Sequence, residues 1–235
     1  MTTQGRVFLF NIGRVPVVAH PTYLLLVLLC FASYRYAPPS QMLALGFVYL
    51  IGVTVSIILH ELGHVGMGLA FGIRSTAIEI NGLGGLAYLQ REAQKRWQSI
   101  AISLAGPAVN LALYLLAQLL TWGLVQWNTS AIEAGDADDP YFPYGVYQAL
   151  GDFEFANGFM FVFNLLPAFP LDGGRALRQL ISGFARDLVA LHAVAVLGML
   201  TGFAILGLSR QYGYGMIYLG LYMMLENWQI FRSTR

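Results

Sequence analysis

The sequence predicts an all-α membrane protein, with about six transmembrane helices and short membrane-associated β-hairpins near residues 6–18 and 74–89. Three observations predict this class. Of the 235 residues, 57% are hydrophobic and only 11% are charged, whereas soluble domains carry roughly a quarter charged residues. Long apolar segments recur along the chain, and the basic residues between them are unevenly distributed. No separate soluble domain or internal repeat is evident, so residues 1–235 are expected to form a single polytopic domain.

The two hairpins are predicted from their turn residues. In the first, a run of apolar residues is followed by Asn11-Ile12-Gly13 and then by a second short apolar run. In the second, residues 76–80 alternate between polar and apolar, and Asn81-Gly82 is a tight-turn signal. Gly84 and Gly85 follow that turn, and glycines in a strand allow another backbone to approach closely.

The spans are predicted from apolar runs that are bounded by proline, glycine or charged residues. They cover, in order, residues 23–34, 43–71, 100–127, 153–166, 188–208 and 214–228. The segment 128–148 contains several acidic residues and no lysine or arginine, and it is expected to be a loop. An even number of spans places both termini on the same side of the membrane.

The basic residues orient the chain, because cytoplasmic loops carry an excess of lysine and arginine. Of 13 such residues, two, Arg35 and Arg210, fall on one side. The other eleven fall on the opposite side, namely Arg6, Arg14, Arg74, Arg91, Lys95, Arg96, Arg175, Arg178, Arg186, Arg232 and Arg235. We therefore expect a multi-pass protein of the cell membrane with cytoplasmic termini. The net charge of +1 gives no indication of nucleic-acid binding, and the single cysteine, Cys30, excludes an intrachain disulfide.

The residues His60-Glu61-Leu62-Gly63-His64 lie inside the second predicted span. Positions i and i+4 share one face of a helix, so both imidazoles can bind one metal ion, and Glu61 can reach a water bound to that ion. A catalytic zinc ion takes three protein ligands and keeps one position open. Ionisable groups at this depth in a membrane are costly and usually functional. The motif therefore predicts one Zn²⁺ ion with His60 and His64 as ligands and Glu61 as the general base.

The third ligand is best sought among intramembrane carboxylates. Asp172 follows Pro167 and Pro170 at the cytoplasmic end of the fourth predicted span. The charge-based orientation puts this end at the same depth as the histidine motif. His20 and His192 stay open as alternative ligands, although an interface or packing role is favoured for both.

The pair His-Glu-x-x-His and Asn-x-x-Pro-x-x-Pro-Leu-Asp-Gly resembles the site-2 protease family of intramembrane metalloproteases. The stretches Val-Pro-Val-Val-Ala-His-Pro-Thr, Gly-Leu-Gly-Gly and Ala-Gly-Pro-Ala-Val-Asn are also similar to that family. The resemblance implies Asp172 as the third zinc ligand and implies contact between Asn164 and the substrate chain. Asn164 could instead satisfy carbonyls freed by Pro167, and Asn110 is expected to hold helices together.

These inferences predict a zinc-dependent intramembrane endopeptidase that takes part in regulated intramembrane proteolysis. Its partners would be a single-span membrane-protein substrate and the lipid bilayer. An unwound substrate could pair with the 74–89 hairpin, with Gly84 and Gly85 as substrate-binding residues; alternatively, the hairpin only seals the cavity. The main rival is a divalent-metal transporter, which would need polar residues on both membrane faces. A non-catalytic scaffold is disfavoured because Glu61 and all three ligands are present.

Overall fold

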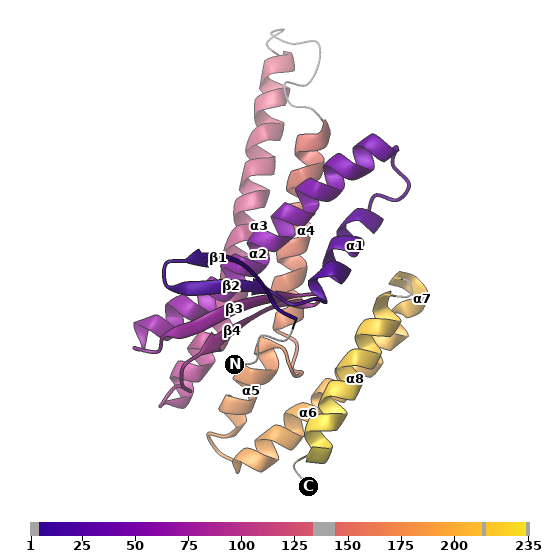
Figure 1. Cartoon of the computed structure of the whole chain (residues 1–235). Helices are drawn as coiled ribbons and strands as arrows, with labels where there is room; N and C mark the ends of the chain where they lie inside the picture. The colour runs from indigo at the N-terminus through magenta and orange to yellow at the C-terminus, as the bar shows by residue number, and fades with distance from the viewer. Residues whose placement is uncertain (1–4, 134–143, 213–214, 234–235) are drawn as a thin grey trace. The chain divides into compact units, whose positions relative to one another are not determined.

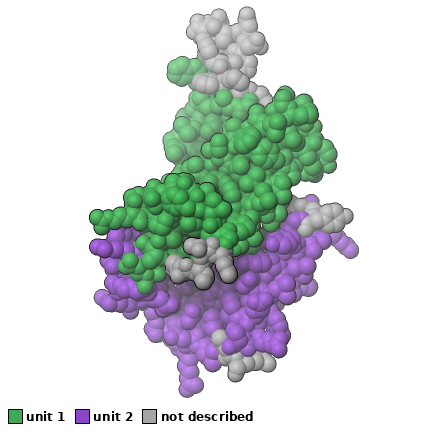
Figure 2. Space-filling model, in the orientation of Figure 1, with its two compact units in different colours: residues 1–62, 75–90, 108–160 green, residues 63–74, 91–107, 161–235 purple. Residues whose placement is uncertain are grey.

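A computed structural model describes residues 5–133, 144–212 and 215–233. The chain forms two compact units, shown in Figure 2. Unit 1 comprises residues 1–62, 75–90 and 108–160, and unit 2 comprises residues 63–74, 91–107 and 161–235. The predicted single domain stays a prediction.

Unit 1 contains a four-stranded sheet with the order β1-β2-β3-β4 (Figure 1). The strands are β1 (Val7–Ile12), β2 (Val15–Ala19), β3 (Ser75–Asn81) and β4 (Gly84–Leu89). Both predicted hairpins are therefore present. They were predicted as separate hairpins, but β2 and β3 pair in parallel and join them into one sheet. This pairing places Val17 opposite Ile78, and both side chains are buried. Burial of these two apolar side chains favours the pairing of the two hairpins.

The turn residues have the expected backbone geometry. Gly13, between β1 and β2, has a φ of 58°, which lies in the left-handed region that glycine tolerates best. Between β3 and β4, the side-chain Oδ1 of Asn81 accepts a hydrogen bond of 2.9 Å from the N–H of Leu83. Such an Asx turn stabilises the reversal that the Asn-Gly pair predicts.

The helices of unit 1 pack around a core that includes Cys30, Val53, Ile57 and Ala156. They are α1 (Tyr23–Ala32) and parts of α2 (Pro39–Ala70), α3 (Arg96–Glu133) and α4 (Tyr144–Asn164). Helix α3 ends at Glu133 and α4 begins at Tyr144, so both extend into residues 128–148, which were predicted to be a loop. The predicted loop was therefore too long. Residues 134–143, the rest of that loop, lie outside the described residues.

The end of α2 is fixed by a glycine. Gly72 has a φ of 70°, and its N–H donates to the carbonyl of Leu69, while the N–H of Ile73 donates to the carbonyl of Gly68. These two bonds form a Schellman motif, which closes a helix with a left-handed residue. The chain can then leave the helix directly into β3.

Unit 2 contains α5 (Asp172–Ile181), α6 (Asp187–Gly207), α7 (Ser209–Tyr212) and α8 (Gly215–Ser233), of which α5 and α7 were not predicted. Helices α6 and α8 approach closely at Gly202 and Gly220, where a Cβ on either residue would lie 2.7 Å from the carbonyl oxygen of the other. Ala168, Ile205 and Met223 form the buried core beside them.

Among the described residues, three helices are long and apolar enough to cross a membrane, covering Pro39–Ala70, Arg96–Ser130 and Asp187–Gln211. Helix α1 has 10 residues and therefore spans about 15 Å, roughly half of a hydrocarbon core of about 30 Å. The structure thus supports a largely helical membrane protein with a small sheet. The count of six spans stays a prediction.

Candidate zinc site

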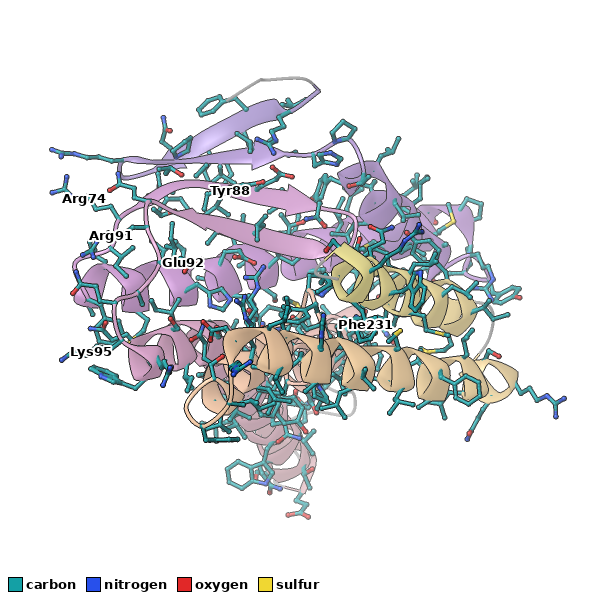
Figure 3. All side chains as sticks on the ribbon, turned by 90° about the horizontal axis from the view of Figure 1, so that it is seen from below. Arg74, Tyr88, Arg91, Glu92, Lys95 and Phe231 are labelled. Atoms are coloured by element: carbon teal, nitrogen blue, oxygen red, sulfur yellow. The ribbon has the colours of Figure 1, made fainter. Side chains whose placement is uncertain are left out.

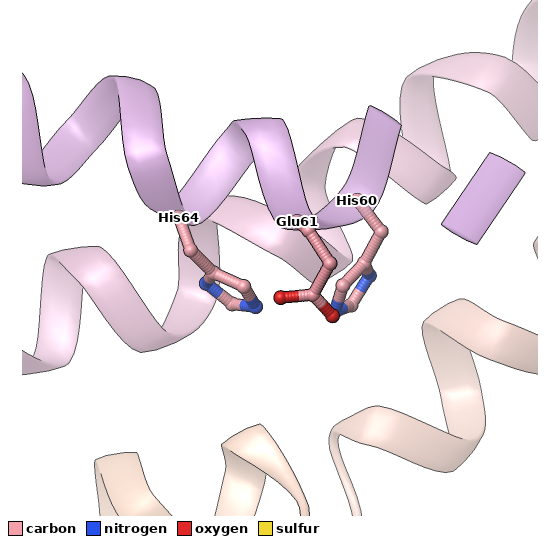
Figure 4. Close-up of side chains that lie close together, drawn as sticks. All are labelled: His60, Glu61 and His64. Atoms are coloured by element: carbon pink, nitrogen blue, oxygen red, sulfur yellow. The ribbon is translucent and has the colours of Figure 1, made fainter. Parts of the chain in front are cut away.

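The three residues of the first motif project from the same side of α2 (Figure 4). One ligand atom from each of His60, Glu61 and His64 lies within 4.8 Å of the others, and all three residues are buried. The helical spacing of the motif accounts for this arrangement, since His60 and His64 are one turn apart. The cluster has the composition expected of a metal site.

The ring of His60 is held by a chain of buried polar side chains inside unit 1. Its Nδ1 lies 2.5 Å from Oδ1 of Asn110. The amide of Asn110 donates to Oδ1 of Asn157 over 2.9 Å, and Asn157 donates to Oγ of Ser56 over 2.9 Å. When Nδ1 serves as a donor, Nε2 is the nitrogen that can bind a metal, and such outer partners orient metal-binding histidines.

The ring of His64 is held by the backbone of α3 inside unit 2. Its Nδ1 lies 2.6 Å from the carbonyl oxygen of Ile102. A carbonyl only accepts hydrogen bonds, so Nδ1 of His64 is the donor, and in the neutral ring Nε2 has the lone pair that a metal needs.

Asp172 meets His64 at that second nitrogen. Oδ2 of Asp172 lies 3.3 Å from Nε2 of His64, and both residues are almost completely buried. Two ligand atoms that bind one zinc ion at about 2.1 Å, separated by the tetrahedral angle, lie roughly 3.4 Å apart. The observed separation therefore suits two ligands of one zinc ion.

The two glycines after Asp172 allow its helix to begin where it does. A Cβ on Gly173 would lie 2.2 Å from the carbonyl oxygen of Leu165, and a Cβ on Gly174 would lie 2.4 Å from that of Ala168. Only glycine therefore lets the first turn of α5 pack onto the segment that follows α4. This contact fixes the position of the Asp172 backbone within unit 2.

The predicted substrate-binding residues have different surroundings. Gly85, in β4, lies against Glu61, because a Cβ on Gly85 would be 2.6 Å from both Cγ and Oε1 of that residue. Gly84 has a φ of 143°, and a Cβ added there would meet nothing within 4 Å. Asn164 is the half-buried last residue of α4. Their roles in substrate binding stay predictions.

The two alternative ligands make other contacts. Nδ1 of His20 lies 2.8 Å from Oγ1 of Thr22 at the start of α1. The ring of His192 packs on Phe231 of α8, labelled in Figure 3, with 4.8 Å between ring centroids. These contacts support the interface and packing roles favoured for both histidines.

Several residues around the site were missed or only partly understood from the sequence. Asn110 was expected to hold helices together, and it does contact Asn157, but it also contacts His60. Asn157 and Ser56 were not singled out, although a polar residue in an apolar helix was an available signal. Asn227, a buried residue of α8, was also missed.

Comparison with known proteins identifies a family for the central part of the chain. The profile of peptidase family M50 matches residues 48–150. The Synechocystis protein sll0528, named provisionally as a zinc metalloprotease, is 31% identical over 71% of this chain. The zinc metalloprotease MJ0392 of Methanocaldococcus jannaschii is 27% identical over 74% of it. The chain spans 42% and 45% of the length of these two relatives.

The fold also matches a solved structure. The site-2 protease from Methanocaldococcus jannaschii superimposes with a TM-score of 0.60 and 22% identity, over 97% of this chain and 93% of that one. At this identity the likeness concerns the fold. Together the comparisons confirm the predicted resemblance to the site-2 protease family, and the two sequence relatives are themselves named as zinc metalloproteases.

Proposed function

From the premise that this chain carries a domain of peptidase family M50, the site-2 protease family, we propose that it is a zinc-dependent endopeptidase that cleaves transmembrane segments of other membrane proteins. The observation that carries the proposal is the 3.3 Å contact between His64 and Asp172, next to the buried His60, Glu61 and His64 on α2. Apolar helices long enough to cross a membrane support a substrate that is itself embedded in lipid.

In this proposal His60, His64 and Asp172 hold one zinc ion. Zinc supplies Lewis acidity, which lowers the pKa of a bound water toward about 7 and polarises the scissile carbonyl. Glu61 accepts the proton from the attacking water and delivers it to the leaving amine. The contacts of Nδ1 with Asn110 and Ile102 hold the two imidazoles with Nε2 available for metal binding.

The substrate is presented along β4, beside the general base. The sheet order makes β4 an edge strand among the described strands, and an extended peptide can add to such an edge through backbone hydrogen bonds. Gly85 lies against Glu61, so a peptide on this edge would bring its own backbone close to the base. Asn164, the last residue of α4, would make a further contact with the substrate chain.

The C-terminal end of β4 is held in place by side-chain contacts. Tyr88, labelled in Figure 3, donates a hydrogen bond of 3.0 Å to Glu79 on β3, and Glu79 pairs with Arg6 at 2.8 Å. Burial, and secondarily this hydrogen bond, raises the pKa of Tyr88, so its hydroxyl stays protonated and can donate. A strand anchored in this way offers a substrate a fixed template.

We further propose that the termini and the mouth of the site are cytoplasmic, in the cell membrane. Arg74, Arg91 and Lys95 lie between the end of α2 and the start of α3 in unit 2, at one end of the view in Figure 3. This cluster supports the orientation because lysine and arginine favour the cytoplasmic side. The partners would be a single-span substrate and the surrounding lipid, with no role for nucleic acid.

The experiment uses purified protein in lipid vesicles, a panel of single-span substrates, and assays with and without a zinc chelator. Glu61→Gln should abolish cleavage but keep zinc, because the side chain acts on water and does not bind the metal. Asp172→Ala should lose both cleavage and tight zinc binding, because one of three protein ligands is gone.

Three results would contradict the proposal. Cleavage that persists in the presence of chelator would exclude zinc-dependent hydrolysis by this site. Stoichiometric zinc retained by Asp172→Ala would remove Asp172 from the ligand set. Chelator-sensitive uptake of a divalent metal into the vesicles without any cleavage would favour the transporter.

A further inference from the structure

Asn227, in the middle of α8, makes two hydrogen bonds to the backbone of one residue in the segment that precedes Asp172. Its Nδ2 donates to the carbonyl of Phe169 over 2.7 Å, and its Oδ1 accepts from the N–H of Phe169 over 3.1 Å. The Asn227 side chain is completely buried. It therefore pairs with Phe169 as a neighbouring β-strand would.

The segment 165–171 needs such a partner because it is not helical. It contains Pro167 and Pro170, and its ends are tied by local turns, with the N–H of Ala168 donating to Leu166 and that of Leu171 donating to Ala168. Phe169 lies inside the second of these turns and is buried. In a membrane protein, non-helical backbone is tolerated where protein groups satisfy its polar atoms. Asn227 does this for both polar groups of Phe169.

Helix α6 leaves room for the Asn227 amide. A Cβ on Gly198 would lie 2.2 Å from Oδ1 of Asn227 and 2.6 Å from its Nδ2. A side chain at this position would therefore force the amide away from Phe169. The close approach of α6 and α8 at Gly202 and Gly220 sets the two helices at the distance that this arrangement needs.

Asp172 is three residues beyond Phe169 and begins α5. Its backbone is held from one direction by the contacts of Gly173 and Gly174 with the carbonyls of Leu165 and Ala168. Asn227 holds the same segment from α8. We propose that Asn227 is a positioning residue, which keeps the carboxylate of Asp172 within reach of the metal bound by His64. This inference rests on the proposed zinc site and assigns Asn227 no contact with the reacting atoms.

The test measures zinc affinity, by competition with a chelator, for the full-length protein in detergent. Asn227→Leu keeps the branched shape of the side chain but loses both hydrogen bonds, and it should weaken zinc binding by about 10- to 100-fold, as loss of an outer-shell partner does. Asn128→Leu is the matched control, since Asn128 is also a buried asparagine in a long helix but bonds to Tyr147. It should keep wild-type zinc affinity.

A second pair of variants leaves Asn227 itself intact. Gly198→Ala should displace the Asn227 amide and weaken zinc binding, whereas Gly207→Ala on the same helix should not, because a Cβ there would meet nothing within 4 Å. With Co²⁺ in place of zinc, the visible spectrum should change in Asn227→Leu and Gly198→Ala and stay unchanged in the two controls.

The results of these measurements distinguish failure of the positioning role from failure of the proposed zinc site. Wild-type zinc affinity and an unchanged cobalt spectrum in both Gly198→Ala and a folded Asn227→Leu would overturn the positioning role. If Asn227→Leu does not fold, the Gly198→Ala result decides alone. A wild-type protein that binds no zinc would overturn the zinc site itself, and the positioning role with it.

Discussion

At the scale of residues, the two histidines are held by partners of different kinds. His60 contacts a side chain, Asn110, which a substitution can remove. His64 contacts a backbone carbonyl, that of Ile102, which no side-chain substitution removes directly. The orientation of His60 therefore depends on three polar side chains in series, whereas that of His64 depends on the position of α3.

Substitution of Gly85 tests the role of Glu61 as general base without changing any of the proposed metal ligands. In Gly85→Ala, the new methyl group would lie 2.6 Å from the Glu61 side chain. The Glu61 side chain is flexible, so it should move while the fold is kept. A displacement of about 1 Å in a catalytic group can cost roughly 100-fold in rate. We expect kcat to fall by about that factor, with unchanged zinc affinity and thermal stability.

Gly66→Ala is the matched control, because Gly66 is exposed on the same helix as Glu61 and a Cβ there would meet nothing within 4 Å. It should retain wild-type kcat. Wild-type kcat in Gly85→Ala would show that the base tolerates the new methyl group, and would count against β4 lying beside the reacting bond.

The sequence predicts the residues of the proposed zinc site better than it predicts the residues that hold them in place. His60, Glu61 and His64 are recognisable because their spacing alone puts them on one helical face. Asp172 required a second motif and the charge-based orientation. Asn157 and Asn227 could not be assigned partners, because their contacts join segments 47 and 58 residues apart in the chain.

At the scale of elements, local signals predict both hairpins but not how they combine. Turn residues such as Asn81 act over a few positions, so the sequence indicates where each hairpin reverses. The parallel pairing of Val17 with Ile78 brings together residues separated by the whole of α1 and α2, and no local pattern encodes it. Helix α5 was missed because the Asp-Gly-Gly sequence is typical of a turn.

The edge of β4 can be tested with two neighbouring prolines. Successive residues of a strand direct their N–H groups to opposite edges, so one of Leu86 and Ala87 donates toward β3 and the other toward the open edge. Leu86→Pro and Ala87→Pro should therefore behave differently. The variant that loses the β3 bond should lower the melting temperature. The variant that loses the N–H at the open edge should have the wild-type melting temperature. It should cleave helical substrates up to about tenfold more slowly, because loss of one hydrogen bond costs about that factor.

A short, already extended peptide is the control substrate for the second variant. It does not need to be held unwound on the strand, so its cleavage should change less than that of a helical substrate. Equal slowing on both substrates, or slowing on neither, would contradict strand addition and favour a hairpin that only seals the cavity.

At the scale of the whole molecule, the charge distribution and the helix lengths predict different numbers of membrane-crossing helices. The charge distribution fits six spans, because that topology places eleven basic residues on one side of the membrane and two on the other. Helix length supports fewer spans, because within the described residues three helices are long and apolar enough to cross and α1 is short. The two predictions differ most at the α1–α2 connection, which contains Tyr36.

Cysteine labelling can decide between these topologies, because the chain has one cysteine and it is buried. In a Cys30→Ala background, a single cysteine would replace Tyr36, Glu133 or Ser233, each of which is exposed. A membrane-impermeant maleimide is then applied to intact cells and to inverted vesicles. Six spans predict that Ser233→Cys reacts only in inverted vesicles, and that Tyr36→Cys and Glu133→Cys react only in intact cells. Reaction of Tyr36→Cys only in inverted vesicles would mean that α1 does not cross, and reaction of Ser233→Cys in intact cells would overturn the cytoplasmic C-terminus.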